Sequence, residues 1–212
     1  MSNIVNLKNL NLIGDFEIEK LINKLSKIHF ENLPYSFYTT AGFNTVKFYY
    51  KLLLLNNNLN LIISQEDNSN INGFVIWGPA KISLFKTLFK NIFKFNYAKD
   101  LNLNELFKVE IIKKIFLKFF GNSYKYELKS NSAEIVSIAV DKNSQGQGIG
   151  SELINQVLID CQVNSYCSLY ATTTSYQKSA IRFYNSLNNF VLVFEKKISD
   201  DYAMFIFSKN LI

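Results

Sequence analysis

The stretch that decides the fold is Glu134-Ile-Val-Ser-Ile-Ala-Val-Asp141, followed by Gln145-Gly-Gln-Gly-Ile-Gly150. Its first part is strongly apolar and predicts a buried strand. Its second part is a glycine-rich turn, and the apolar spacing over 149–161 predicts a helix directly after it. This order aims several backbone N–H groups and the positive end of a helix dipole at one place. We therefore expect an anion site suited to a pyrophosphate.

The turn differs from two common phosphate-binding motifs. A P-loop ends in Gly-Lys-Ser/Thr, whereas this turn ends in Gly150-Ser151-Glu152. A dinucleotide-binding turn is followed by an acidic residue about 20 residues later, and Asp160 comes too early for that. The glycines by themselves therefore indicate an anion site without naming its ligand.

Length and composition indicate one folded domain over residues 1–212, and the order of predicted helices and strands given below makes it an α/β domain. The chain is 48% hydrophobic and 19% charged, which excludes general disorder. Its two cysteines and single histidine exclude a disulfide scaffold and a multi-histidine metal centre, so we expect no metal site. Neither a signal peptide nor an apolar run of membrane-spanning length is found. We therefore expect a cytoplasmic protein with reduced thiols.

Hydrophobic periodicity predicts alternating helices and strands along the chain. Helices are expected over 16–30, 43–55, 81–95, 106–120, 149–161 and 178–187, and strands over 4–10, 59–65, 71–77, 134–140, 167–172, 190–195 and 202–207.

Positive charge is concentrated in one segment. Between Lys81 and Lys129 there are eleven lysines against four acidic residues, a net +7, whereas the whole chain carries +6. Arg182 is the only arginine. A nucleic-acid-binding face more often includes arginines that grip phosphate, so we expect no nucleic-acid partner.

Two motifs resemble the GNAT acetyltransferase superfamily. Gln145-x-x-Gly148-x-Gly150 after the apolar strand resembles its acetyl-CoA signature, and Ala180-Ile-Arg-Phe-Tyr184 followed by Phe190 resembles its second motif. The resemblance is strong over Glu134–Phe207 and compatible over residues 1–79. It implies a mixed, mostly antiparallel sheet, splayed between its fourth and fifth strands and flanked by helices. Residues 81–132 are then a basic two-helix insertion between the third and fourth strands.

The resemblance implies a site for acetyl-CoA as the acyl donor. The pantetheine arm would pair with strand backbone at Ile138, Ala139 and Val140. The turn would hold the pyrophosphate through Gln145, Gly146, Gln147, Gly148, Ile149, Gly150 and Ser151. Gln177 stands where the family often has an asparagine that contacts the cofactor, and Asn188-Asn189 replaces the usual glycine before Phe190.

The resemblance also implies two catalytic roles. Glu134 begins the strand, where several family members use a glutamate as general base, directly or through water; the alternative is a solvated charge at a strand end. Tyr184 stands where the family often has a tyrosine near the sulfur of CoA, so that its hydroxyl could protonate the leaving thiolate. The alternative is an aromatic side chain that packs its helix on the sheet.

Acceptor contacts are expected from the loop between the first two helices, which commonly walls the acceptor site in GNAT folds. Tyr35, Tyr38 and Thr39 are the candidates there, with a loop packed on the sheet as the alternative. Trp77 either lines the same cleft or fills the core. His29 either faces the acceptor or interacts with the last carbonyls of its helix.

Together these features imply an N-acetyltransferase in which an amine attacks the thioester directly. The first choice of acceptor is the primary amine of a small molecule, and a basic insertion beside the cleft would favour a nucleotide-linked amino sugar. Two alternatives stay open, namely a protein or peptide N-acetyltransferase and an acyl-CoA-binding module without catalysis. The insertion is open to three interpretations: solvated faces, a lid or dimer surface, or contact with an anionic membrane through 81–120. The chain is a monomer or a homodimer.

Overall fold

A computed structural model of the chain describes residues 3–7, 15–40, 42–54, 56–67, 70–80 and 128–211. The chain divides into two units, and nearly all described residues belong to the one that comprises Met1–Lys81 and Lys129–Ile212. The helices expected over 81–95 and 106–120 lie outside the described residues. The insertion and its boundaries therefore stay predictions.

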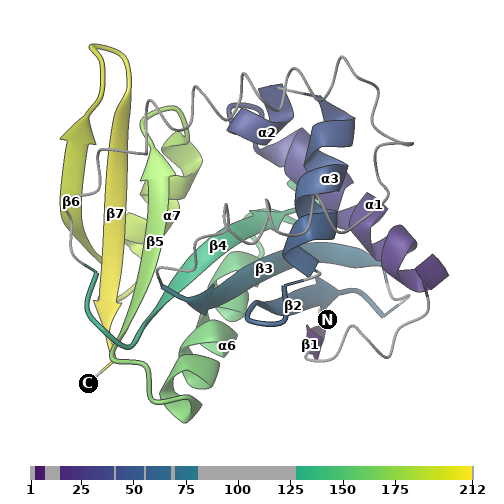
Figure 1. Ribbon diagram of the computed structural model, residues 1–212, viewed down its shortest axis with the longest axis horizontal. Coiled ribbons are helices and arrows are strands. Elements are labelled where there is room, and N and C mark those ends of the chain that lie inside the picture. The colour runs from purple at the N-terminus through teal and green to yellow at the C-terminus, as the bar shows by residue number, and fades with distance from the viewer. Residues whose placement is uncertain are drawn as a thin grey trace. The chain divides into compact units, whose positions relative to one another are not determined.

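Within the described residues the strands form one sheet in the order β1-β2-β3-β4-β5-β7-β6 (Figure 1). Neighbouring strands are antiparallel except β4 and β5, which are parallel. This confirms the predicted mixed, mostly antiparallel sheet. The strands are β1 (Asn3–Leu7), β2 (Asn60–Gln65), β3 (Ile71–Pro79), β4 (Ser132–Val140), β5 (Ser168–Thr174), β6 (Val191–Lys197) and β7 (Ala203–Asn210).

The helices flank this sheet, and their positions agree with the predicted ranges to within a few residues. A short helix, α2, had no counterpart in the sequence pattern because it spans only one turn. The helices are α1 (Asp15–Asn32), α2 (Phe37–Thr40), α3 (Phe43–Leu54), α6 (Ile149–Val163) and α7 (Lys178–Ser186), with a 3₁₀ turn at Lys142–Ser144. None of the helices within these ranges has the length and hydropathy of a membrane-spanning segment.

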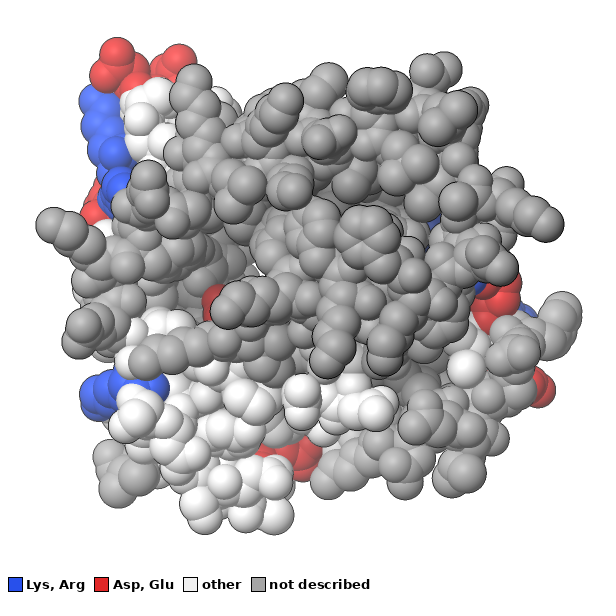
Figure 2. Space-filling model, in the orientation of Figure 1, with Lys and Arg blue, Asp and Glu red and all other residues white. Residues whose placement is uncertain are grey.

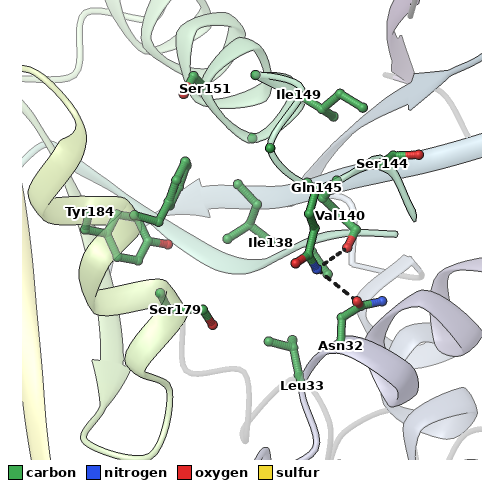
Figure 3. Close-up of a pocket in the computed structure, with 16 residues that line it drawn as sticks. Asn32, Leu33, Ile138, Val140, Ser144, Gln145, Ile149, Ser151, Ser179 and Tyr184 are labelled. Atoms are coloured by element: carbon green, nitrogen blue, oxygen red, sulfur yellow. Dashed lines mark hydrogen bonds between the residues drawn. The ribbon is translucent and has the colours of Figure 1, made fainter. Parts of the chain in front are cut away.

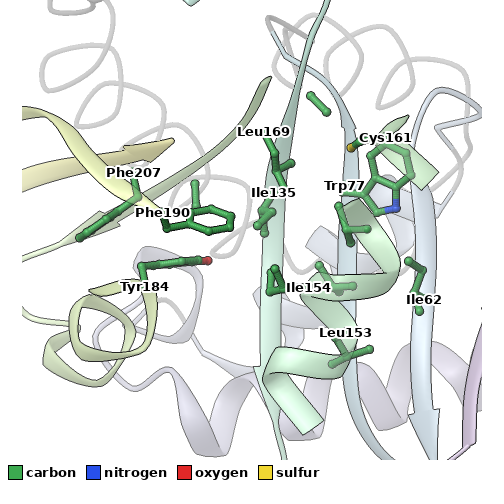
Figure 4. Packing of buried hydrophobic residues seen from close by; sticks show 14 of the residues in the cluster. Ile62, Trp77, Ile135, Leu153, Ile154, Cys161, Leu169, Tyr184, Phe190 and Phe207 are labelled. Atoms are coloured by element: carbon green, nitrogen blue, oxygen red, sulfur yellow. The ribbon is translucent and has the colours of Figure 1, made fainter. Parts of the chain in front are cut away.

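Alternation along β3 assigns the helices to opposite faces of the sheet. Val75 and Trp77 point into the core beneath α6, whereas the Phe74 ring meets the Tyr50 ring of α3 at a centroid distance of 5.4 Å. Figure 4 shows the α6 side, where Leu153 and Ile154 pack against the strands. We call these the α6 face and the α3 face.

Strands β4 and β5 are paired over only part of their length. Pairing runs from Ser132↔Ser168 to Ile135↔Ala171 and then stops. The remainder of β4 therefore has a free edge on that side, as the GNAT resemblance implied. The splay lies between β4 and β5 in Figure 1.

A bulge in β4 changes which side chains share a face. Trp77 pairs with Ile135, but the preceding Ile76 pairs with Ser137, so that Val136 is the extra residue. Without the bulge Glu134 and Ser137 would point to opposite faces. With it, both lie on the α3 face.

The core beneath α6 also contains Cys161, which is fully buried. Burial raises the pKa of its thiol to about 12. Both Cys161 and Cys167 are free. Cys161 therefore behaves as a small apolar side chain and not as a nucleophile.

Charged side chains of both signs meet at the tip of the β6–β7 hairpin (Figure 2). There Lys197 Nζ lies 2.9 Å from Asp200 Oδ1, and both side chains are largely exposed. Such a pair contributes little to stability because water screens it.

Replacing Gly73 with alanine tests how tightly β3 and α6 pack. The added Cβ would lie 2.9 Å from Cγ2 of Ile149 and 3.3 Å from Cδ1 of Leu153, so these side chains of α6 must shift. We expect Gly73→Ala to lower the free energy of unfolding by about 1–3 kcal/mol, as is usual for overpacked cores. Urea denaturation measures the change, and an unchanged midpoint would contradict the tight packing.

Candidate functional site

A cavity of about 330 Å³ opens where β4 separates from β5 (Figure 3). Its walls are the free edge of β4, the glycine-rich turn, the start of α6, one side of α7 and the end of α1. Of the predicted site residues, the cavity brings together Ile138, Ala139, Val140, Gln145, Gly146, Gly148, Ile149, Gly150, Ser151 and Tyr184.

The glycine-rich turn has a backbone that favours glycine at two positions. Gly146 has φ +77° and Gly148 has φ +84°, both in the left-handed region. Gly148 is also the N-cap of α6, and Glu152 N donates to Gly148 O at 3.0 Å. The N–H groups of the helix's first residues therefore have no partner within the helix and border the cavity. This is the geometry of an anion site.

The side chain of Gln145 holds the turn in place. Its Nε2 donates to the carbonyl oxygen of Val140 at 3.1 Å and to Oδ1 of Asn32 at 3.0 Å (Figure 3). One amide thus ties the turn to β4 and to the end of α1. The side chain of Gln145 is therefore occupied in fixing the loop.

The free edge of β4 presents main-chain groups to the cavity. Asp141 N donates to Asn72 O of the strand on the other side. Because hydrogen bonds of an antiparallel strand alternate in direction, Ile138 and Val140 then direct their N–H and C=O groups away from β3. These groups face the unpaired edge, where an extended ligand can bind them as a further strand would.

Tyr184 closes the cavity from α7. Its ring stacks on Phe207 at a centroid distance of 5.4 Å, and its hydroxyl is directed toward β4 (Figure 3). The side chain is only 3% exposed, and burial raises the pKa of the phenol. The hydroxyl is therefore protonated at neutral pH and can act as a proton donor.

Glu134 lies on the α3 face, close to the point where β4 and β5 separate. Thr172 Oγ1 donates to Glu134 Oε1 at 3.3 Å. Burial raises the pKa of the carboxyl, partly offset by this hydrogen bond. A carboxylate with a raised pKa is a better proton acceptor than a solvated one. Burial raises the pKa of Tyr49 on α3, with smaller contributions from Tyr38, Tyr50 and Glu134.

Comparison with known proteins agrees with this geometry. Residues 115–190 match the sequence model of the acetyltransferase (GNAT) family. The matched part contains the glycine-rich turn and the motif with Tyr184, and it supports the predicted superfamily and the acetyltransferase class. No curated protein sequence matches the chain.

Several solved structures share the fold of this chain. A structure assigned to the GNAT family from Desulfovibrio desulfuricans has a TM-score of 0.61 at 14% identity, and the alignment covers 100% of both chains. An N-acetyltransferase from Staphylococcus aureus Mu50 has a TM-score of 0.57 at 14% identity over 100% of this chain and 99% of the other. A Salmonella typhimurium structure solved with its cofactor acetyl-CoA has a TM-score of 0.55 at 13% identity over 99% and 95%.

Two of the residues predicted to contact acetyl-CoA are not among those that line the cavity. Gln147 is exposed, and its Nε2 donates to Asn143 O at 3.3 Å. Gln177 is the N-cap of α7, where its Oε1 accepts from Thr173 Oγ1 at 2.9 Å. Both side chains therefore hold local structure.

The predicted acceptor contacts lie on other parts of the domain. Tyr35 is 64% exposed, with its ring 6.0 Å from that of Tyr176. Tyr38 stacks on Tyr49 at a centroid distance of 3.9 Å, and Thr39 is hydrogen-bonded to Ser36. These three residues are near the α3 face and do not line the cavity.

Trp77 fills the core, one of the two alternatives for this residue. It is 1% exposed and packs beneath α6 beside Cys161 (Figure 4). The register of β3 explains the placement, because Trp77 pairs with Ile135 and shares its orientation toward α6.

Six residues that line the cavity were not predicted as site residues, although two of them, Ala180 and Phe183, belong to the motif that contains Tyr184. Ser179, Ala180 and Phe183 share one face of α7 with Tyr184, so helical spacing from Tyr184 could have found them. The others come from the end of α1 and the 3₁₀ turn, namely Asn32, Leu33 and Ser144. No local signal marks the end of α1 as a neighbour of the turn, because the contact depends on the tertiary fold.

Replacing Glu134 with glutamine tests the burial of the carboxyl. The folded chain holds the proton to higher pH than the unfolded chain, so ionisation of Glu134 reduces stability as pH rises above the unfolded pKa. We expect Glu134→Gln to stabilise the chain at pH 8 by about 0.5–2 kcal/mol, the range of single stabilising changes. The difference should shrink as pH falls toward 4. Urea denaturation at several pH values measures it.

Glu195→Gln on the exposed edge strand β6 is the matched control. Its effect on stability should stay within about 0.5 kcal/mol. Equal effects of the two substitutions at pH 8 would contradict the burial of Glu134.

Proposed function

We propose that this chain is a GNAT acetyltransferase that transfers an acetyl group from acetyl-CoA to the primary amine of a small molecule. The observation that carries the proposal is a single cavity bordered both by an anion site and by a free strand edge. Acetyl-CoA needs both, because its pyrophosphate is an anion and its pantetheine arm carries amides. The acetyl-CoA in the Salmonella typhimurium relative agrees with this assignment.

In this proposal each wall of the cavity has a separate task. The N–H groups at the start of α6 hold the pyrophosphate, and Ile138 and Val140 bind the pantetheine arm through their main chain. Gly146 and Gly148 keep the turn free of side chains where the phosphates approach. The N–H of Ile138 polarises the thioester carbonyl, a role worth about 3–4 kcal/mol in other enzymes.

The proposed reaction is direct attack of the amine on the thioester. Glu134 takes a proton from the ammonium form of the acceptor, directly or through water, because only the neutral amine has a free electron pair. The C–N bond then forms as the C–S bond breaks, and the acylated nitrogen releases its second proton to water, from which Tyr184 is later reprotonated. Tyr184 gives its proton to the departing thiolate. Its buried, protonated hydroxyl supports this role.

The acceptor lies on the α3 face in this proposal, with Tyr35, Tyr38 and Thr39 as candidate contacts. A nucleotide-linked amino sugar is our preferred acceptor within the amine class. The support for it is the net charge of +7 between Lys81 and Lys129, which would attract a phosphorylated molecule.

Thiol release from acetyl-CoA tests the activity. The amine panel contains a UDP-linked amino sugar, spermidine, kanamycin and a short peptide. We expect turnover with at least one amine, and a fall in kcat of about 10²–10⁴-fold in Glu134→Gln, the usual contribution of a general base. The wild-type rate should fall as pH drops through the raised pKa of Glu134, because the carboxyl becomes protonated. Tyr184→Phe should lower kcat while acetyl-CoA binding is kept.

Each outcome of this assay has a clear meaning. Turnover confined to the peptide would replace the small-molecule acceptor with a protein or peptide. Binding of acetyl-CoA without turnover of any amine would overturn the catalytic proposal in favour of a binding module.

Two glycines with similar backbones provide a matched test of the donor site. Gly148 (φ +84°) lines the cavity, whereas Gly42 (φ +106°) lies before α3, and an added Cβ meets no atom within 4 Å at either. Replacing either glycine with alanine should lower the free energy of unfolding by about 1–3 kcal/mol, because the backbone at these positions is strained for any other residue. We expect Gly148→Ala alone to weaken acetyl-CoA binding, by about tenfold or 1.4 kcal/mol, in isothermal titration calorimetry. Equal loss of binding in both variants would contradict the assigned pyrophosphate site.

A further inference from the structure

Five polar side chains form a continuous hydrogen-bonded chain beneath the α3 face. Ser137 Oγ of β4 lies 2.9 Å from the Tyr50 hydroxyl, which lies 2.7 Å from His29 Nδ1. His29 Nε2 lies 2.6 Å from Ser36 Oγ, and Ser36 Oγ lies 2.8 Å from Thr39 Oγ1. We call this set the His29 chain. It joins β4 to the segment Ser36–Thr40, which contains α2.

His29 is the centre of this chain and is neutral at physiological pH. It is 3% exposed, and burial lowers its pKa to about 4. The groups that face it are Tyr49 and Tyr50 of α3 and Ser36, none of which is charged at neutral pH. No charged group among the described residues contributes to its pKa shift.

The partners of a neutral His29 fix its tautomer. A phenol donates a hydrogen bond more readily than it accepts one from an imidazole N–H, so the Tyr50 hydroxyl donates to Nδ1. Nε2 then carries the proton and donates to Ser36 Oγ. Ser137 can donate to Tyr50, and Ser36 to Thr39. Every donor thus points the same way, from β4 toward Thr39.

Burying a chain of polar side chains lowers stability unless all of their hydrogen bonds are made. Each of its groups loses hydration, and the loss is offset only while every hydrogen bond is kept. Apolar side chains would fill the same space without that condition. The network therefore specifies the position of the segment Ser36–Thr40 relative to β4.

Both ends of the chain lie at groups used by the proposed reaction. Ser137 precedes Ile138 in β4 and shares a face with Glu134 because of the bulge at Val136. At the other end, Tyr38 of α2 stacks on Tyr49 of α3. The segment Ser36–Thr40 is thus anchored to β4 on the same face as the proposed base.

We propose that His29 is a positioning residue for the acceptor. Through Ser36 it holds α2 and the candidate contacts Tyr38 and Thr39 in one position. Through Tyr50 and Ser137 it connects that segment to β4. The acceptor amine then meets Glu134 and the thioester in one geometry. This inference rests on the proposed acetyl transfer.

Tyr50→Phe is the sharpest test, because it removes the central hydroxyl and keeps the ring packed on Phe74. Steady-state kinetics with the best amine of the panel should show kcat/KM for the amine reduced about tenfold to a hundredfold. KM for acetyl-CoA should change less than about twofold, since the donor cavity has no member of the His29 chain. Tyr166→Phe, a tyrosine at the far end of α6, should leave both values unchanged. Ser137→Ala and His29→Gln should reproduce the effect of Tyr50→Phe.

Two readouts that do not depend on activity report on the chain itself. His29 is the only histidine, so its ¹⁵N NMR signals are assigned without ambiguity. They should show the Nε2–H tautomer and no titration between pH 8 and pH 5. Hydrogen exchange of the peptide over 33–42 should become faster in Tyr50→Phe and stay unchanged in Tyr166→Phe.

The outcomes separate the two levels of the proposal. Absence of turnover in the wild type overturns the proposed function, and the positioning role falls with it. Wild-type turnover with unchanged amine kcat/KM in Tyr50→Phe overturns only the positioning role, even where the variant is less stable. Titration of His29 near its ordinary pKa would overturn the neutral, buried chain.

Discussion

The incomplete pairing of β4 with β5 is the constraint on which the rest of the structure depends. After Ile135↔Ala171 the edge of β4 has no partner strand, although its N–H and C=O groups still need hydrogen bonds. The Gln145 side chain satisfies one of these groups, the carbonyl of Val140. The others open onto the cavity, at the same place where α6 presents its N-terminus. The edge of β4 and the N-terminus of α6 both have backbone groups without a partner in their own element, and together they form two walls of one cavity.

Burial shifts the pKa values of Glu134 and His29, which both lie on the α3 face, in opposite directions. It raises the pKa of Glu134 and lowers that of His29, so in both cases the neutral form is favoured. For Glu134 this makes the carboxylate a stronger proton acceptor once it is formed. For His29 it removes the histidine from proton exchange near neutral pH and leaves a fixed donor and a fixed acceptor. The same desolvation therefore suits one group to chemistry and the other to positioning.

Most residues of the cavity could be predicted to lie together because their sequence signals are local. The glycine-rich turn, the strand before it and the helix after it are contiguous, and Tyr184 falls in a short motif of its own. Trp77 could not be placed, because its orientation depends on the register between β3 and β4. The His29 chain could not be found either, since His29, Tyr50 and Ser137 are separated by 21 and 87 residues. The position of Ser137 further depends on a bulge that the apolar run does not reveal.

In the proposed reaction, the bulge at Val136 allows one strand, β4, to contact both the amine and acetyl-CoA. Side chains of an ordinary strand alternate, so Glu134 and Ser137 would point to opposite faces. With one extra residue both point to the α3 face, where the segment Ser36–Thr40 is anchored. Directly after them, Ile138 and Val140 turn their main-chain groups to the free edge and the cavity. In the proposed reaction the side chains of β4 thus act on the amine while its backbone binds the thioester, and the two meet at the residues that follow the bulge.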